Sequence, residues 1–384
     1  MNSKTKIFYW SPYLVNIATP KAVINSALAM SNYSTNYECS IINFFGEFEK
    51  FKNSLNEKNI HFWDHYNPKY LKLLPKHGKL YSRISFLIIF ISSFFPLKKL
   101  LEKNRPDFIV IHLITSLPLI LLILFNFKTK FILRISGYPQ MNFVRKFLWK
   151  LAFKKIHLIT CPTKYTCEYL KSLKLTDNKK IKLLYDPIIE VNEINKKKRI
   201  KKNIDIRDYQ YFISIGRLTK QKNFLFLCKV FKNVVSNNPN LRLLIAGEGE
   251  DKKKINNYIK DNSLEKNIIL LGYIENIFPI LIKAKALILP SLWEDPGFVL
   301  IESGFCKLPV ITSDCPNGPK ELVKHNQNGF IFRNNDAYSC EEQISNFLEQ
   351  KKDLKKILYN NLKMSKMFSL YNHQKSFKDI IKGV

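Results

Sequence analysis

The sequence predicts an α/β protein with two doubly wound parallel-sheet domains. Short apolar runs of strand length alternate with stretches of helix length from the N-terminus to about Tyr185. Such alternation is typical of a parallel sheet covered by helices. The pattern breaks at Asp186 and Pro187 and starts again at Tyr211. A length of 384 residues is enough for two domains of ordinary size.

The first half begins with an apolar strand at 5–10. Further strands are predicted at 39–45, 108–112, 130–135, 156–161 and 180–185, and helices near 20–32, 84–103, 117–126, 143–154 and 164–174. The run 117–126 lies between two strands, so we expect a buried crossover helix. The apolar run 84–95 is shorter than a bilayer span and is followed by Pro96 and two lysines. We favour a buried core helix for it over one that dips into the membrane interface.

The stretch 190–207 is polar, with lysine or arginine at most positions between 196 and 202. We expect it to be a solvated linker. The predicted organisation is therefore a first domain over 1–187, a linker over 188–208, a second domain over 209–366 and a C-terminal helix over 367–384.

The most informative pattern lies in the second half, where a strand is followed by a helix. The apolar run 285–289 predicts a buried strand, and Pro296-Gly297 stops it before a helix over 298–305. In such a βαβ unit the ligand lies at the carboxyl end of the strand. The free N–H groups at the start of the helix favour an anion there.

Two acids flank this helix start. Glu294 lies in the predicted crevice, and Glu302 lies one turn inside the helix, four residues after Phe298. Their carboxylates can accept hydrogen bonds from sugar hydroxyls while the N–H groups hold a phosphate. Alternatively, Glu294 only stabilises the helix dipole and Glu302 is a solvated helix acid.

A second motif repeats the arrangement of strand, glycine, polar loop and helix over 212–223. Gly216 allows the backbone to approach a ligand closely. Arg217 offers a planar fork of donors and Lys222 a point charge, and both suit a diphosphate. The alternative is a basic surface loop, which we favour for Lys220 alone.

Further motifs follow in a fixed order along the second half: Gly-Arg-Leu-x-x-x-Lys-Asn from Gly216, Ile245-Ala246-Gly247-Glu248-Gly249, Gly272-Tyr273, Glu294 and Glu302, Pro309-Val310-Ile311, and Gly318-Pro319-Lys320-Glu321. This order resembles the retaining, nucleotide-sugar-dependent glycosyltransferases of family 4, which have the GT-B fold. The segments 291–298 and 314–321 resemble those of bacterial enzymes that build surface polysaccharides. The resemblance implies two Rossmann-like domains that face a cleft. The first would bind the acceptor and the second the nucleotide sugar, with the C-terminal helix crossing back onto the first.

The resemblance also implies roles for single residues. Arg217 and Lys222 would grip the donor diphosphate and stabilise the departing nucleotide. Glu294 would bind hydroxyls of the donor sugar, and Glu302 those of the ribose. No metal is expected, because the two cations take its place. Backbone N–H groups at the helix start would cap a phosphate oxygen, at Phe298, Val299 and Leu300.

The first half departs from the family pattern. The loop 11–20 lacks the usual glycine pair, and the stretch 134–139 lacks a histidine that many relatives carry. Ser136 and Gly137 are candidates to line the cleft at a strand end. Arg134 either meets an acceptor phosphate or is a salt-bridged strand residue.

The chain is strongly basic, with 62 Lys and Arg against 31 Asp and Glu and a net charge of +31. Such a chain should adhere to anionic partners. No nucleic-acid motif is present and the basic residues are dispersed, so we do not expect nucleic acid. Contact with the anionic inner membrane leaflet and general enrichment in Lys, Asn and Ile explain the charge together.

Seven scattered cysteines show no zinc-site spacing, and the apolar strand at 7–10 follows the N-terminus without a signal peptide pattern. We therefore expect a cytoplasmic protein with reduced thiols, peripheral on the inner face of the cell membrane.

The predicted activity is a retaining transfer of sugar from a nucleotide sugar, expected to be a UDP-sugar, to a saccharide or polyprenyl-linked saccharide. Surface polysaccharide synthesis is the expected role. Two alternatives remain: a GT-B nucleotide-sugar epimerase, and a non-enzymatic basic nucleic-acid-binding protein.

Overall fold

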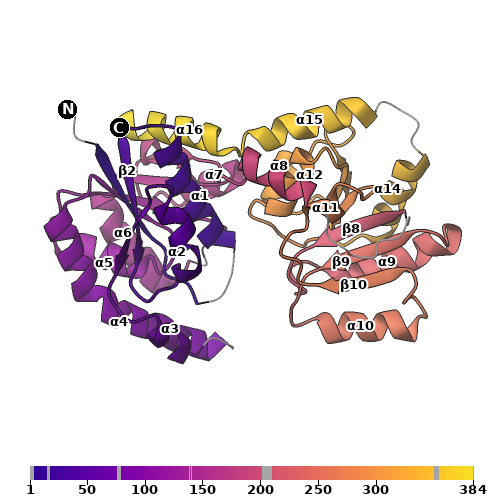
Figure 1. Cartoon of the computed structure of the whole chain (residues 1–384), viewed down its shortest axis with the longest axis horizontal. Coiled ribbons are helices and arrows are strands. Elements are labelled where there is room, and N and C mark those ends of the chain that lie inside the picture. Colours follow the sequence, from indigo (N-terminus) through magenta and orange to yellow (C-terminus); the bar gives the residue numbers. More distant parts are fainter. Residues whose placement is uncertain are drawn as a thin grey trace. The chain divides into compact units, whose positions relative to one another are not determined.

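The computed structural model describes residues 4–14, 18–75, 79–137, 139, 141–200, 210–349 and 354–383. The chain divides into two compact units (Figure 1). The first comprises Met1–Pro187 and Leu370–Val384, and the second comprises Ile188–Ser369.

The first unit is built on a parallel sheet. Within the described residues it has seven strands in the order β3-β2-β1-β4-β5-β6-β7. The strands are β1 (Thr5–Trp10), β2 (Tyr37–Asn43), β3 (His61–Asp64), β4 (Phe108–Ile111), β5 (Lys130–Arg134), β6 (Leu158–Cys161) and β7 (Ile181–Leu183). The helices are α1 (Ala18–Asn32), α2 (Glu49–Asn56), α3 (Lys69–Leu73), α4 (Lys79–Asn104), α5 (Ser116–Leu124), α6 (Phe143–Lys155), α7 (Lys164–Ser172) and α16 (Leu370–Lys382).

Both faces of this sheet are buried. Along β1, Phe8 and Trp10 belong to one hydrophobic cluster, whereas Ile7 and Tyr9 belong to another. Successive strand residues point to opposite faces, so the two clusters lie on the two sides of the sheet. Near-continuous apolar strands are what a sheet covered by helices on both faces requires.

The second unit repeats this topology. Its sheet, as far as the chain is described, has six strands in the order β10-β9-β8-β11-β12-β13. The strands are β8 (Tyr211–Ile215), β9 (Arg242–Ala246), β10 (Ile268–Gly272), β11 (Leu287–Leu289), β12 (Val310–Ser313) and β13 (Phe330–Phe332). The helices are α8 (Val191–Arg199), α9 (Phe224–Asn237), α10 (Lys252–Asp261), α11 (Phe278–Leu281), α12 (Phe298–Phe305), α13 (Gly318–Leu322), α14 (Ala337–Glu349) and α15 (Leu354–Lys366).

In each sheet the strand order reverses direction once, beside the first strand of the unit. The reversal lies between β1 and β4 in the first unit and between β8 and β11 in the second. Open α/β sheets bind ligands outside the carboxyl ends of the strands at such a point. The topology therefore indicates one ligand-binding edge in each unit.

The C-terminal helix α16 packs in the first unit, beside α1 (Figure 1). Phe377 and Ile381 are buried in the same cluster as Ile7 and Tyr9. His373 is also buried, with Nε2 2.8 Å from Ser26 Oγ and Nδ1 2.7 Å from the carbonyl oxygen of Tyr185. Burial lowers the pKa of His373 to about 4, so the ring is neutral at pH 7.

Two parts of the chain differ from the sequence prediction. The stretch 49–73, for which we expected no elements, contains α2, the edge strand β3 and α3. Residues 191–199, expected in a solvated linker, form helix α8 of the second unit, which contacts α11 and buries Ile194. The prediction of a linker is wrong for this segment. Ile194 packs as the buried residue of an otherwise polar helix, and the helix is held against α11. The rest of the expected linker, 201–208, lies outside the described residues.

Helix α4 also differs from the prediction. It continues through Pro96 to Asn104, and Leu97 and Leu101 pack in the core of the unit. Its other face is exposed, with Leu87 58%, Ile91 63% and Phe95 74% accessible. The preference for a buried core helix is therefore wrong for that face. Among the described residues, 83–104 is the one helix long and apolar enough to cross a membrane, which by itself is weak evidence for a span.

Candidate functional site

In the loop after β8, the side chain of Lys222 packs against the backbone of Gly216. The Lys222 side chain runs over Gly216, where an added Cβ would lie 3.0 Å from Lys222 Cε. A Cβ on Gly247, after β9, would lie only 1.8 Å from the Gly216 carbonyl oxygen. The two loops therefore cross at backbone distance, which only glycine permits.

Lys222 forms an ion pair with Glu294, which follows β11. The two side chains are 14% and 5% exposed. The Ser291 hydroxyl donates to Glu294 Oε1 at 2.6 Å. A carboxylate held by an ammonium group and a hydroxyl in a nearly dry environment is fixed in orientation. The structure thus brings together two residues that the sequence places 72 positions apart.

Backbone contacts hold the two loops together beside this pair. Leu292 N–H donates to the Gln221 carbonyl at 2.8 Å, and Gln221 Nε2 donates to the Trp293 carbonyl at 2.9 Å. Asn334 Nδ2, from the loop after β13, donates to the Leu292 carbonyl at 3.1 Å. The positions of Lys222 and Glu294 are therefore set by hydrogen bonds to main-chain carbonyls as well as by their own ion pair.

Helix α12 begins directly beside this ion pair. Its N-cap is Gly297, with φ +88°, and a Cβ there would contact Glu294 at 3.4 Å. The amides of Phe298 and Val299 occupy the first turn, where no intrahelical acceptor exists. The Leu300 N–H donates to the Gly297 carbonyl at 3.0 Å, so it is a weaker candidate donor for a phosphate than we expected.

The segment after β12 packs against the residues that precede α12. A Cβ on Gly318 would lie 1.6 Å from the carbonyl oxygen of Pro296. The sequence analysis placed Gly318 in a motif but did not predict its contact with Pro296. It assigned no role to Ser291 or Asn334. A serine three residues before a conspicuous acid, at a strand end, is the signal that could have identified Ser291.

The remaining predicted donor-site residues belong to the same unit. Arg217 is exposed directly after Gly216, and Glu302 is partly buried inside α12. Cys315 follows β12 in this unit. Burial raises the pKa of its thiol to about 12. Cys315 is therefore a neutral packing residue at pH 7.

The three predicted acceptor residues lie in the first unit at the end of β5. Arg134 is buried and forms an ion pair with Asp186, which is the structural role that the sequence left open for it. Its Nη1 has no hydrogen-bond partner among the described residues. Ser136 is exposed, and Gly137 has φ +72°. The Lys222–Glu294 pair belongs to the other unit.

Residues 195–364 match the family model described as glycosyl transferases group 1. An uncharacterized glycosyltransferase of Methanocaldococcus jannaschii is 30% identical over 247 residues, which cover 59% of this chain and 60% of that protein. The chain therefore matches less than two thirds of that relative.

A second relative is from Campylobacter jejuni and is named N-acetylgalactosamine-N,N'-diacetylbacillosaminyl-diphospho-undecaprenol 4-alpha-N-acetylgalactosaminyltransferase. It is 28% identical over 268 residues, covering 68% of this chain and 69% of the relative. Among solved structures, Anabaena HepE in complex with UDP superposes with a TM-score of 0.71, covering 99% of this chain and all of HepE at 14% identity. At this identity the likeness establishes the fold, two parallel-sheet α/β domains of the GT-B type.

Proposed function

We propose that this protein is a glycosyltransferase that moves a sugar from a nucleotide sugar, a UDP-sugar in the first instance, to a saccharide or lipid-linked saccharide acceptor. The observation that carries the proposal is the buried pair of Lys222 and Glu294 beside the first turn of α12. A cation, a fixed carboxylate and free helix N–H groups together match a diphosphate that bears a sugar. The activity for which the Campylobacter relative is named and the matching family model support the same class.

The pair also indicates how a donor would be held. A diphosphate would compete with Glu294 for the Lys222 ammonium group, and Arg217 would add a second, forked contact. Glu294, still oriented by Ser291, would then accept a hydrogen bond from a sugar hydroxyl. Glu302 would take the ribose hydroxyls. The amides at the start of α12 would meet the charge that develops on the departing diphosphate.

We propose transfer with retention of configuration, by attack on the leaving-group face. The acceptor hydroxyl oxygen forms the new bond to the anomeric carbon while the bond from that carbon to the diphosphate oxygen breaks. The electron pair of the broken bond stays on the diphosphate, and the hydroxyl proton passes to a diphosphate oxygen. We expect no metal requirement, because Arg217 and Lys222 supply the positive charge.

The acceptor and the location follow from the surface of the first unit. Helix α6 exposes Phe143, Val144 and Phe147 together with basic side chains, and α4 exposes an apolar face. Apolar anchors among cations suit the surface of an anionic bilayer. The Campylobacter relative is named for an undecaprenyl-diphosphate-linked acceptor. We therefore place the protein on the inner face of the cell membrane, acting on a polyprenyl-linked saccharide.

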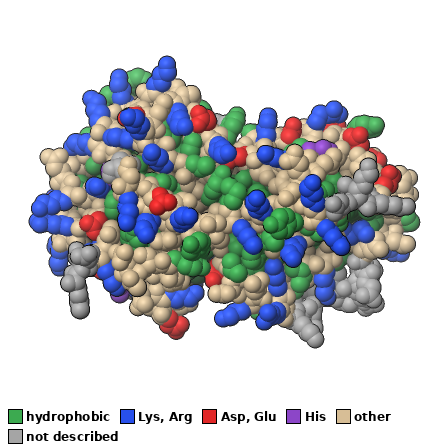
Figure 2. Space-filling model, turned by 90° about the horizontal axis from the view of Figure 1, so that it is seen from above, with side chains coloured by type: hydrophobic (Ala, Val, Ile, Leu, Met, Phe, Trp, Pro, Cys, Tyr) green, Lys and Arg blue, Asp and Glu red, His purple; other side chains and the backbone are tan. Residues whose placement is uncertain are grey.

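The charge itself does not favour nucleic acid. Figure 2 shows Lys and Arg side chains spread over the visible face, without a single basic stripe. A nucleic-acid surface concentrates its cations on one face or along one helix.

The test begins with thermal unfolding in the presence of UDP-, GDP- and ADP-sugars. A ligand that binds only the folded state raises the melting temperature, so one nucleotide should stand out. The selected donor is then incubated with undecaprenyl-diphosphate-linked saccharide in vesicles, with and without EDTA, and the product's anomeric configuration is read by NMR. We expect transfer that retains the configuration and resists EDTA.

Matched variants separate site from surface. Arg217→Lys keeps the charge but loses the fork, and transfer should fall about 10- to 100-fold. Lys220→Ala, three residues away and exposed, should stay within about twofold of the unchanged protein. Donor consumption without any acceptor would point to an epimerase instead, and no stabilisation by any nucleotide sugar would reject the proposal.

A further inference from the structure

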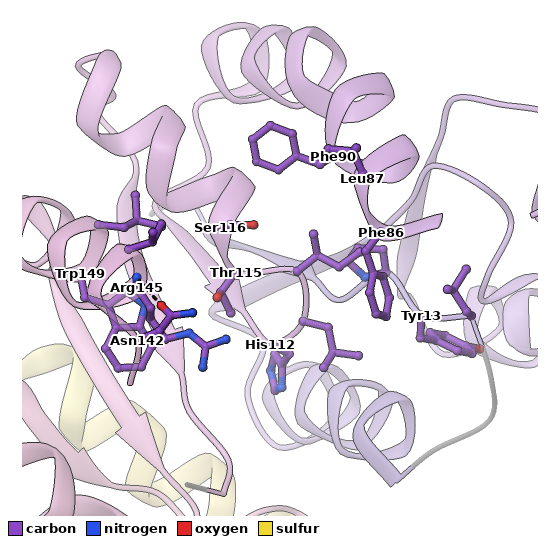
Figure 3. Close-up of a pocket in the computed structure, with 16 residues that line it drawn as sticks. Tyr13, Phe86, Leu87, Phe90, His112, Thr115, Ser116, Asn142, Arg145 and Trp149 are labelled. Carbon is purple, nitrogen blue, oxygen red and sulfur yellow. Dashed lines mark hydrogen bonds between the residues drawn. The ribbon is translucent and has the colours of Figure 1, made fainter. Parts of the chain in front are cut away.

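The first unit contains a cavity of about 720 Å³ at the carboxyl ends of β1 and β4 (Figure 3). It lies at the point where the strand order of this sheet reverses. Helices α4 and α6 and the start of α5 form its walls. A volume of this size is within the range of small-molecule sites, about 300–1,000 Å³. None of the predicted site residues lines it.

The lining is mostly apolar and carries a few polar groups. Figure 3 shows Phe86, Leu87 and Phe90 of α4 together, with Asn142 and Arg145 across the space from them. Ser116 also lines the cavity. The cavity is therefore amphipathic: Arg145 lies on α6 together with the apolar residues Val144 and Trp149, and the side chains of α4 across from it are aromatic and aliphatic.

His112 lines the cavity from the end of β4. Its Nε2 atom is buried and has no hydrogen-bond partner among the described residues. Burial and the nearby Arg134 charge hold the pKa of His112 well below its usual range, so the ring is neutral. A buried polar atom without a partner costs free energy unless a ligand or water satisfies it.

The mouth of the cavity continues into exposed apolar surface. Leu87 lines the cavity and is 58% exposed, and Val144 on α6 lines it and is 72% exposed. Phe143 and Phe147 lie beside Val144 on the same helix. An apolar chain that leaves the cavity would therefore meet further apolar side chains rather than water.

We propose that this cavity binds the isoprenoid chain of a polyprenyl-diphosphate-linked acceptor, next to its diphosphate. The first isoprene units would lie against Phe86, Leu87 and Phe90, and the rest of the chain would leave past Val144. The Arg145 guanidinium would pair with the diphosphate, for which its planar fork is suited. The assignment of this chain to an acceptor rests on the proposed function.

Other occupants fit the cavity less well. A free saccharide needs many hydrogen-bond partners, but most of the wall is apolar. A free inorganic phosphate would leave the apolar wall in water. A polyprenyl diphosphate offers an apolar chain to the apolar wall and an anion to Arg145.

The test uses geranylgeranyl diphosphate as a soluble probe, below its micelle concentration, by titration calorimetry on the full chain. Inorganic diphosphate and dihexanoyl phosphatidylglycerol are titrated in parallel. Leu87→Asp places a carboxylate at the apolar wall, and Arg145→Glu reverses the charge of the arginine in the lining. Each should weaken binding of geranylgeranyl diphosphate about 10-fold or more.

Two control variants make the same changes outside the lining. Ile91→Asp is on α4 and Lys146→Glu is on α6, both at exposed positions, and each should bind within about twofold of the unchanged protein. All four positions are at the surface, so the melting temperatures should stay close to one another. In the transfer assay, Leu87→Asp should raise KM for the lipid-linked acceptor about 10-fold and leave KM for the nucleotide sugar unchanged.

Each outcome bears on one proposal. Equal binding of geranylgeranyl diphosphate by Leu87→Asp and Ile91→Asp would overturn the cavity assignment, and so would equal or tighter binding of dihexanoyl phosphatidylglycerol or inorganic diphosphate. Sugar transfer by a protein that does not bind the isoprenoid probe would remove this inference and leave the proposed function standing. Isoprenoid binding with the expected variant pattern, but no donor binding, would remove the proposed function and the acceptor role, leaving an isoprenoid site.

Discussion

The two units share one topology but have opposite chemistry at their carboxyl edges. The strand order of the second sheet repeats that of the first six strands of the first sheet. In the second unit this edge carries the buried Lys222–Glu294 pair and the start of α12. In the first it carries an apolar cavity with one arginine at the rim. The comparison teaches that the same sheet topology can carry a polar or an apolar edge, depending on the loops and helices that surround it.

Glycine distribution accounts for part of this difference. Eight of the chain's 12 glycines lie within 188–369, and several of them sit where loops cross at backbone distance, as at Gly216, Gly247 and Gly318. Close backbone approach exposes N–H groups and fixes charged side chains. The carboxyl edge of the first unit is instead flanked by bulky residues of helices α4 and α6, such as Phe86 and Trp149, with apolar space between them.

The largest expected effect comes from breaking the polar edge of the second unit. Glu294→Gln should lower transfer about 100- to 1,000-fold, because the fixed charge beside the donor is lost. Lys222→Ala should lower it similarly and also reduce stability, because it leaves Glu294 buried without its cation. Initial rates with saturating acceptor, together with melting temperatures, measure both effects.

The matched control for this pair is an exposed ion pair in the same unit, Lys252–Glu248. Surface pairs of this kind contribute about 0–1 kcal/mol to stability. Glu248→Gln should therefore leave both rate and melting temperature nearly unchanged. Similar losses in Glu248→Gln and Glu294→Gln would contradict the special role of the buried pair.

The next effect tests whether the polar edge depends on close loop contact. Gly318→Ala introduces a methyl group 1.6 Å from the Pro296 carbonyl oxygen, so the loops after β11 and β12 must separate. We expect donor affinity to fall about 10-fold and the melting temperature to fall by several degrees. Calorimetric titration with the selected nucleotide sugar measures the first effect. Gly383→Ala, near the C-terminus with a nearest contact of 3.2 Å, is the control that should change neither.

A smaller effect should distinguish the surfaces of the two units. Replacing Phe143 and Phe147 of α6 together by serine should reduce binding to phosphatidylglycerol vesicles about 10-fold, because two exposed apolar anchors are lost. The same replacement of two exposed tyrosines in the second unit, Tyr338 and Tyr359, should have little effect. Vesicle flotation at low and high salt measures both, and equal losses would deny the first unit a special role at the membrane.

A pH-dependent effect concerns the helix that packs the C-terminal segment onto the first unit. The pKa of His373 is about 4 in the folded protein and is near 6.5 in an unfolded chain. The unfolded chain therefore binds the proton first as pH falls. The stability contributed by the neutral ring is complete above pH 6.5 and is lost as pH falls toward 4, by up to about 3 kcal/mol.

His373→Gln should therefore be less stable than the unchanged protein at pH 7 and approach it at pH 4.5. Glu47 acts in the opposite direction, since burial raises its pKa to about 7 and its contribution to stability is lost as pH rises from 4.5 to 7. Glu47 is present in both His373→Gln and the unchanged protein. Its contribution therefore cancels when the stability of one is subtracted from that of the other at each pH. Denaturant unfolding at several pH values measures this difference. A difference that does not change with pH would show that His373 does not titrate as expected.

Much of the fold was predictable from local pattern. The strand at 5–10 and the helix at 298–305 have the bounds that apolar periodicity and Pro-Gly signals indicate. The stretch 49–73 was missed, because β3 has four residues, lies at the sheet edge and buries little apolar surface. Helix α8 was missed because its lysines outnumber its single buried isoleucine. Local pattern fails where an element is stabilised by its neighbours rather than by its own composition.

By itself the sequence determined the alternation of strands and helices and the residue types at each strand end. These depend on side-chain periodicity and turn chemistry, which act over a few residues. Only the tertiary structure decided that Lys222 forms an ion pair with Glu294 and that Arg134 forms one with Asp186. It also decided that α4 leaves one face exposed beside a cavity. Those outcomes depend on how segments far apart in the chain pack against one another, and packing fills or leaves space according to all of its neighbours at once.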